Sequence, residues 1–209
     1  MVYFYQSQPD ELSIPHWIVV GKDKEENDLL IKYGYKDLGY YWFHADRYSS
    51  AHVYLKLLDS EKDLADVPRL VINDCLQLCK SKSIQGNKLA QCAIIVTPWH
   101  NLRKSGYMKP GEVSFKSTKR VQRMECHARE NKILNRLDKT RIEVIDNVEQ
   151  LLHEAKKSKD GEFLSNFVKM NRDRLREDEQ ERRRTNKLKK KSPQNKDSQP
   201  EEKATESPS

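Results

Sequence analysis

Residues 40–57 have the sequence YYWFHADRYSSAHVYLKL, and this stretch decides the fold class. Residues 40–46 and 51–57 are rich in aromatic and β-branched side chains. Such side chains favour extended backbone because they fit a pleated, half-buried surface. Residues 47–50 between them are polar and typical of a turn. The stretch therefore predicts two neighbouring strands.

The two strands predict a polar row on one face of a sheet, because successive strand residues point to opposite faces. One row of the first strand contains Trp42, His44 and Asp46, and one row of the second begins with His52 and Tyr54. If the two rows share a face, His44 pairs with Tyr54 and Asp46 with His52. The sequence does not determine this register.

This row has two interpretations, to which we give equal weight. Aromatic and histidine side chains on an open sheet face can stack on unpaired bases. Trp42, His44 and His52 are therefore candidate nucleic-acid-binding residues. In the other interpretation, Trp42 and Tyr54 fill a small core and the histidines bond to backbone groups.

The remaining apolar patterns predict further strands and helices. Strands are expected at residues 2–5, 17–20, 92–96, 113–115 and 119–126, and helices at 25–33, after Pro68 and at 131–137. Residues 1–145 should form one α+β domain, in which helices pack on a mixed or antiparallel sheet. Residues 146–191 are expected to form a charged, basic C-terminal helix, in which helix formers are interrupted near Gly161. Residues 192–209 should be a disordered tail, because their composition buries too little apolar surface.

Composition excludes several classes of protein. The 209 residues are 36% hydrophobic and include four cysteines. The longest apolar runs are far shorter than the roughly 20 residues of a membrane helix, so we expect no membrane span. Four cysteines without a secretory leader predict reduced thiols and a cytoplasmic protein. Cys-x-x-Cys and His-x-x-x-His pairs do not occur, so no metal site and no cofactor are expected.

The charge distribution indicates a polyanionic partner. The chain has 39 Lys and Arg against 32 Asp and Glu, a net charge of +7. Residues 80–141 contain 15 basic and 4 acidic residues, whereas residues 10–74 contain 8 basic and 13 acidic ones. A domain with one strongly positive half favours nucleic acid on that side.

Two loops and one helix carry the candidate cations. Residues 21–27 (GKDKEEN) supply Lys22 and Lys24 at a strand-to-helix turn, where backbone amides can receive a phosphate. Residues 97–111 (TPWHNLRKSGYMKPG) supply Arg103, Lys104 and Lys109 among aromatic side chains. A third set, in the run 182–191, should add salt-sensitive phosphate affinity: Arg182, Arg183, Arg184, Lys187, Lys189, Lys190 and Lys191.

The catalytic interpretation is an alternative. His44 and Asp46 lie two residues apart on one predicted strand, where a carboxylate can orient an imidazole. With His52 nearby, the three residues are candidates for general acid–base chemistry. The sequence contains no recognised catalytic motif, and residues 21–27 lack the second glycine of a P-loop.

Several motifs occur in the order typical of one family. They are Gly21-Lys22-Asp23-Lys24, Asn27-Asp28, Trp42-Phe43-His44, Ser49-Ser50-Ala51-His52-Val53, Pro68 with its helix, Ser83-Ile84-Gln85-Gly86, Thr97-Pro98-Trp99 and Asn101-Leu102-Arg103-Lys104. In these residues the chain resembles the NFACT-R domain. Residues 131–141 (NKILNRLDKTR) narrow the resemblance to the small stand-alone members, the coiled-coil-domain-containing protein twenty-five family.

The resemblance covers about residues 1–143 and implies an RNA-facing α+β domain with a charged C-terminal helix. Larger relatives are ribosome-quality-control factors that bind large subunits holding stalled peptidyl-tRNA. The chain departs from them at Tyr40-Tyr41, where they usually have an Asp-Ile pair, and at Ala51, where they have glycine. A Cβ at this position obstructs close approach of a phosphate to the backbone. The sequence does not contain their other domains, so we do not expect their tail-elongating activity.

The leading hypothesis is an adaptor that binds RNA or tRNA on ribosomes or large subunits holding stalled peptidyl-tRNA. One alternative is a hydrolase or nuclease-type release factor that acts on stalled peptidyl-tRNA. A second alternative is a DNA-binding protein, which requires only the basic surfaces. The run 182–191 is also a candidate nuclear address, so a nuclear location is expected beside the cytoplasmic one.

Overall fold

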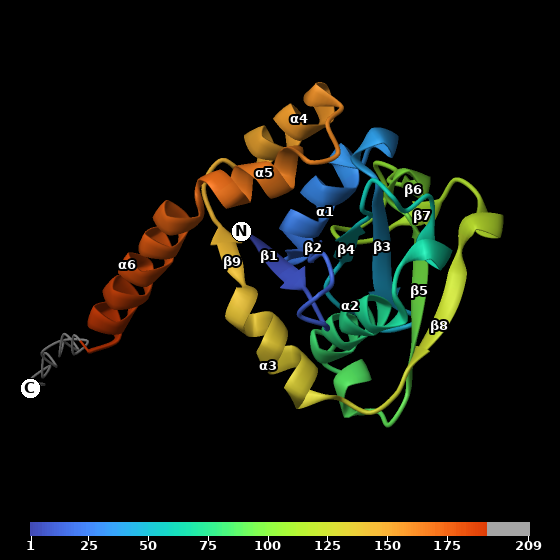
Figure 1. Cartoon of the computed structure of the whole chain (residues 1–209), viewed down its shortest axis with the longest axis horizontal. Helices are drawn as coiled ribbons and strands as arrows, with labels where there is room; N and C mark the ends of the chain where they lie inside the picture. Colours follow the sequence, from blue (N-terminus) through green and yellow to red (C-terminus); the bar gives the residue numbers. More distant parts are fainter. Residues whose placement is uncertain (192–209) are drawn as a thin grey trace, which may run out of the picture.

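A seven-stranded sheet forms the centre of the molecule (Figure 1). The computed structural model describes residues 1–191, and the predicted disordered tail, 192–209, lies outside the described residues. The strand order is β8-β5-β3-β4-β2-β1-β9, and every neighbouring pair is antiparallel. The strands are β1 (Val2–Ser7), β2 (His16–Gly21), β3 (Tyr40–Ala45), β4 (Val53–Lys56), β5 (Cys92–Pro98), β8 (Gln122–Cys126) and β9 (Ile142–Val144).

Helices cover both faces of this sheet and bury a separate apolar cluster on each. Helices α2 (Arg69–Ser81) and α3 (Asn131–Thr140) cover one face. Helices α1 (Lys24–Tyr33), α4 (Val148–Ser158) and α5 (Phe163–Met170) cover the other. Figure 1 shows the two groups on opposite sides of the strands. The predicted α+β fold with an antiparallel sheet is confirmed.

Short elements complete the chain. A separate two-stranded sheet pairs β6 (Leu102–Arg103) with β7 (Ser114–Phe115). The expected strands at 113–115 and 119–126 are present as β7 and β8, although β7 is confined to the small sheet and β8 pairs with β5. The short 3₁₀ helices are Lys36–Leu38, Leu64–Asp66, Gly86–Lys88, Trp99–Asn101 and Thr118–Arg120.

The register of β3 and β4 differs from the one expected. Trp42 lies opposite Tyr54 and Phe43 opposite Val53, so the two polar rows do share a face. The same pairing, continued past Phe43 and Val53, brings His44 beside His52, and their ring centroids are 4.9 Å apart. The expected pairings of His44 with Tyr54 and of Asp46 with His52 are wrong. The connection is longer than the predicted turn, because β3 ends at Ala45 and β4 begins at Val53.

Trp42 and Tyr54 belong to the core, as the second interpretation of this row proposed. Both side chains are 0% exposed. The ring centroids of Tyr54 and Trp99 are 4.6 Å apart, and Trp99 Nε1 donates a hydrogen bond to Leu30 O at 2.7 Å. The middle of the β3–β4 face is therefore a dry aromatic core that also holds α1 in place.

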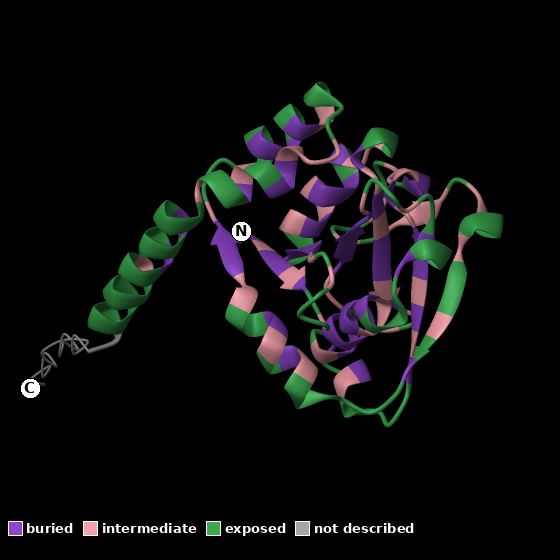
Figure 2. Ribbon diagram, in the orientation of Figure 1, coloured by how far each residue is buried: buried purple, intermediate pink, exposed green. Residues whose placement is uncertain are grey.

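Residues 146–191 form three helices; the first break lies at the interruption predicted near Gly161, and the second, at Asn171, was not predicted. Lys159 adopts a φ of 57°, which ends α4, and Gly161 lies close against Lys56. Leu152 of α4 and Val168 of α5 are buried in the same cluster as the sheet. The globular body thus continues to the end of α5, and only α6 (Arg172–Lys191) extends from it (Figure 2).

Ion pairs attach α6 to the sheet edge. The side chain of Glu143 on β9 is 6% exposed and accepts hydrogen bonds from Arg141 and from Arg182 of α6. Glu179 of α6 pairs with Arg141 at 2.9 Å. Leu175 adds an apolar contact, since it is 6% exposed and belongs to the core. Within residues 1–191, no helix is long and apolar enough to cross a bilayer.

Replacing Glu143 by Gln should loosen α6. The substitution removes the carboxylate shared by Arg141 and Arg182. Hydrogen bonds to charged groups contribute about 1.5–3 kcal/mol, so amide hydrogen exchange along α6 should become roughly tenfold faster or more. Mass spectrometry of peptic peptides measures this rate. Glu181→Gln, at an exposed position of α6, serves as the control. Equal exchange in the two variants would contradict the assigned role of Glu143.

Candidate nucleic-acid interface

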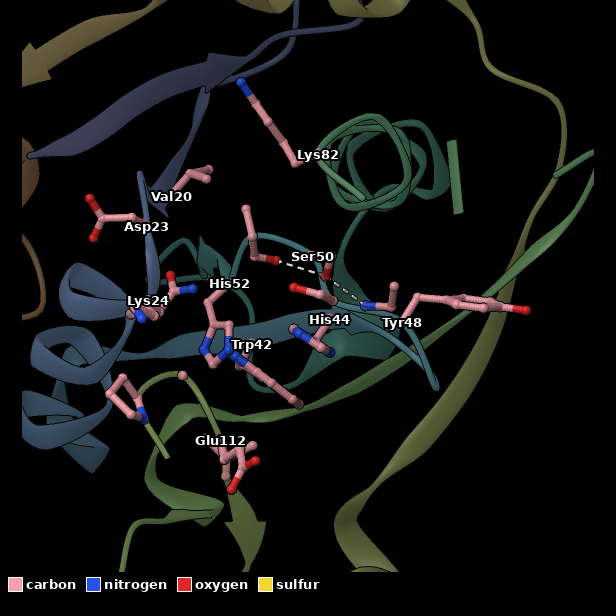
Figure 3. A pocket seen from close by; sticks show the side chains of 18 of the residues that line it. Val20, Asp23, Lys24, Trp42, His44, Tyr48, Ser50, His52, Lys82 and Glu112 are labelled. Atoms are coloured by element: carbon pink, nitrogen blue, oxygen red, sulfur yellow. Dashed lines mark hydrogen bonds between the residues drawn. The ribbon is translucent and has the colours of Figure 1, made fainter. Parts of the chain in front are cut away.

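A cleft of about 910 Å³ opens beside the ends of β2, β3 and β4 (Figure 3). Its walls come from the loop after β2, the loop between β3 and β4, and the segment before β7. Of the predicted site residues, the structure brings five together here: Lys22, Lys24, Trp42, His44 and His52. The volume lies within the range of about 300–1,000 Å³ that is usual for ligand sites.

Three rings form the floor of the cleft. Trp42 and His44 are stacked, with centroids 5.4 Å apart and ring planes 5° from parallel. His52 meets both rings edge-on, at 5.3 Å from Trp42 and 4.9 Å from His44. Trp42 was predicted to stack on a base, but it is fully buried beneath this cluster. Half-buried His44 is the ring of the three that an entering ligand meets first.

Burial keeps both histidines neutral. Burial lowers the pKa of His44, and it lowers the pKa of His52 well below the usual value, with His44 and Lys104 adding to the effect. Asp46 was predicted to orient His44, but it forms an ion pair with Arg123 at 2.9 Å. The expected carboxylate–imidazole pair is therefore not present among the described hydrogen bonds.

Two polar atoms at the cleft have no partner. Trp42 Nε1 and Asn27 Oδ1 are buried without a hydrogen bond within the part of the chain that the structure describes, and both residues line the cleft. Asn27 occupies the space above Gly21, where an added Cβ would collide with Oδ1. The glycine thus permits the position of the asparagine. Unpaired buried groups of this kind indicate a polar ligand or ordered water.

The rim of the cleft is cationic. Lys22 and Lys24 are exposed on the loop after β2. Sequence reasoning missed Arg47 and Lys82, which also line the cleft. Arg47 adopts a φ of 63°, a left-handed conformation that is uncommon outside glycine and that clusters at functional sites. In the sequence analysis Arg47 was only part of a predicted turn. Its positive charge in that turn was the feature that could have marked it as a binding residue.

The backbone amides at the start of α1 are already used. Asp23 caps the helix, and its Oδ1 accepts from the amides of Glu25 and Glu26 at 3.1 and 3.2 Å. The expected binding of a phosphate by these amides is therefore blocked by a carboxylate of the chain itself. Any phosphate in the cleft must depend on the side chains of the rim.

Lys104 is a structural residue, although it was predicted to contact RNA. Its ammonium group donates to Asp28 Oδ1 at 2.8 Å and to the carbonyls of Lys109 and Glu112 at 2.5 and 3.1 Å. These bonds use all three donors of the group. Asp28 also accepts from the amide of Gly111 at 2.7 Å. Together they hold the loop that forms one wall of the cleft against α1.

The other predicted cations lie away from the cleft. Arg103 and Lys109 are exposed and do not line it. In α6, Arg182 and Arg183 pair with Glu143 and Glu179, whereas Arg184, Lys187 and Lys189 are exposed. Helix α6 continues through Lys190 to Lys191. Within residues 1–191, no three His, Cys, Asp or Glu side chains are placed to share a metal ion, and all four cysteines are free and buried.

The sequence matches the family model of the NFACT protein RNA binding domain over residues 1–117. The chain belongs to this family. It is 62% identical over 198 residues to Protein JLP2 of Saccharomyces cerevisiae, which covers 94% of this chain and 95% of that protein. It is 44% identical over 144 residues to Coiled-coil domain-containing protein 25 of Mus musculus, covering 68% of this chain and 67% of that protein. These relatives confirm the resemblance to the small stand-alone members of the family.

Every residue that lines the cleft lies within the 117 matched residues. The chain therefore carries an NFACT RNA-binding domain that contains the whole cleft, and RNA is its partner. The cationic groups of this domain at the cleft are Lys22, Lys24, Arg47 and Lys82, and His44 adds an accessible ring.

The neutral state of His52 has a consequence for stability. The unfolded chain takes up a proton on this histidine near pH 6.5, whereas the folded chain does so only at lower pH. The stability that neutral His52 contributes is therefore fully present above pH 6.5. The free energy of unfolding should fall as the pH drops from 7 to 5. The slope for one such group is at most about 1.4 kcal/mol per pH unit.

Urea unfolding of the His52→Gln variant at pH 7, 6 and 5 tests this. The variant should show a smaller loss of stability on acidification than the unaltered chain. His127→Gln, at an exposed position outside the cleft, should keep the original pH dependence. An unchanged slope in His52→Gln would show that this histidine is not the group responsible.

Proposed function

We propose that this protein binds the RNA of large ribosomal subunits that hold stalled peptidyl-tRNA, and that the cleft receives unpaired or end-exposed nucleotides. The observation that carries the proposal is the cationic rim over a floor of rings within the RNA-binding domain. Lys22, Arg47 and Lys82 supply charge for phosphates, and His44 offers a ring to a base. The ribosomal context rests on the resemblance to ribosome-quality-control factors, and a cytoplasmic location is part of the same proposal.

The shape of the site favours single-stranded over double-stranded nucleic acid. A cleft of about 910 Å³ admits separate nucleotides, whereas a duplex is read across wide surfaces and grooves. The unpartnered Trp42 Nε1 and Asn27 Oδ1 also favour a ligand with polar edges, such as a base or ribose. Double-stranded DNA, which requires only basic surfaces, is therefore the less favoured ligand.

Charge reversal at the rim tests this function. The Lys22→Glu, Arg47→Glu double variant should reduce co-sedimentation with large subunits carrying stalled peptidyl-tRNA by about tenfold or more. The dependence of log affinity on log salt should become shallower by roughly 1.4 if two phosphate contacts are lost. The control is Lys36→Glu with Lys62→Glu, which reverses two exposed cations away from the cleft. If both double variants bind alike, the cleft is not the RNA site.

A second candidate function is hydrolytic release of the stalled peptide, and the histidine pair favours it. His44 and His52 lie 4.9 Å apart in the cleft, and burial lowers the pKa of both, so that both imidazoles are neutral at pH 7 and each has an acceptor nitrogen. A neutral imidazole beside a bound ester can activate water as a general base. Half-buried His44 is the better placed of the two to reach a ligand.

His44→Ala distinguishes binding from chemistry. If the site is hydrolytic, the unaltered protein should convert peptidyl-tRNA to free peptide on a gel, and the variant should lose about 100-fold or more of this rate. Co-sedimentation of the variant with large subunits shows that it still binds. Peptidyl-tRNA that stays intact with the unaltered, bound protein would exclude this second function and leave the adaptor role.

A further inference from the structure

A second, smaller groove of about 300 Å³ lies between the end of α3, the start of β9 and α6. Four cations line it, Lys139, Arg141, Arg176 and Arg183, beside Gln180 and the carboxylate of Glu179. In Figure 1, α3 and α6 flank β9, so the groove joins the globular body to the projecting helix. All of these residues lie beyond residues 1–117, which the RNA-binding family model covers.

The groove has more positive charge than its own carboxylate can compensate. Glu179 pairs with Arg141 at 2.9 Å and also with Arg183. Lys139 and Arg176 are exposed and have no ion pair within residues 1–191. Their donors therefore remain available to an anion that enters the groove.

One aromatic ring contacts a cation from the cleft and a cation from the groove. Tyr3 lines the cleft, and Lys82, which also lines it, holds its Nζ 5.6 Å from the centre of the Tyr3 ring. Arg141, which lines the groove, lies 5.2 Å from the same ring. The ring face attracts both cations. Tyr3 thus holds one cation of the cleft and one cation of the groove near the same ring.

The cations of the groove continue along α6. Arg176, Gln180, Arg183 and Lys187 are spaced four, three and four residues apart, so they lie on one face of the helix. Lys187 is exposed and continues this face beyond the groove.

We propose that the groove is a second phosphate-binding site, which takes the sugar–phosphate backbone of the RNA whose nucleotides enter the cleft. This inference rests on the proposed function, because the cleft defines where the RNA begins. Contacts from lysine and arginine side chains to phosphate oxygens position a nucleic acid but carry no sequence information. The groove therefore adds affinity that is independent of sequence, sensitive to salt and dependent on the length of the RNA.

Two RNA probes and one double variant of the full chain test the proposal. The probes are a single-stranded RNA of about five nucleotides, which is short enough for the cleft alone, and a deacylated tRNA. Lys139→Glu with Arg176→Glu should weaken tRNA binding about tenfold and make its log–log salt slope shallower by roughly 1.4–1.8. Binding of the short RNA should not change.

The matched control reverses one cation on each of the same two helices. Lys132→Glu with Arg172→Glu makes the same change in net charge at exposed positions that do not line the groove. This variant should keep most of its tRNA affinity and the original salt slope. Thermal unfolding of both variants checks that α3 and α6 remain folded.

Any of three outcomes would contradict the proposal that the groove binds phosphate. These are equal tRNA affinity in the two double variants, an unchanged salt slope in the groove variant, and a loss of affinity for the short RNA equal to the loss for tRNA. Failure of the proposed function would be seen separately, because the unaltered chain would then bind neither probe. If the unaltered chain binds both probes and the groove variant binds them with unchanged affinity, the cleft remains the RNA site and the groove is excluded as a phosphate site.

Discussion

The antiparallel register that sets Trp42 opposite Tyr54 is the constraint on which both the core and the cleft depend. Along one face of the same two strands, this pairing places Trp42 and Tyr54 in the dry centre and brings His44 beside His52 at the end. A slip of one residue would turn every side chain of one strand to the opposite face. The slipped strands would lose the packing of Trp99 on Tyr54. They would also lose the hydrogen bond from Trp99 to Leu30 that holds α1. The cleft is therefore a continuation of the core toward solvent.

The basic residues of this chain divide into two groups with different uses. Lys104 has its donors on Asp28 and two carbonyls, and fully buried Lys80 donates to the carbonyls of Gly86 and Leu89. Arg182 is paired with Glu143. These cations stabilise loops and helices, because a buried charge is tolerated only where it is hydrogen-bonded. The count of 39 Lys and Arg residues therefore overstates the number of cations that can meet RNA.

Much of the fold could be predicted from local pattern, and the exceptions share a cause. The long strands and α2 have apolar periodicity, and these were correctly placed. Strand β9 was missed, because its three residues are too few to show a period and its pairing with β1 is made across more than a hundred residues. Helices α4 and α5 were expected as part of the charged C-terminal helix, yet they cover the sheet. Their sequences predict helix, but the surface that they cover is formed by residues far away in the chain.

The sequence by itself determined the α+β class, the family, the cations of the loop at Lys22 and Lys24, and the polar row of Trp42, His44 and His52. These depend on residue type, spacing and motif order, all of which are local. Only the tertiary structure decided that Trp42 is buried, that Lys104 is bound within the chain, and that Arg47 and Lys82 face the cleft. The physical reason is that burial and pairing are set by contacts between residues far apart in the chain. A side chain that has its partners inside the fold is not available to a ligand, whatever its type.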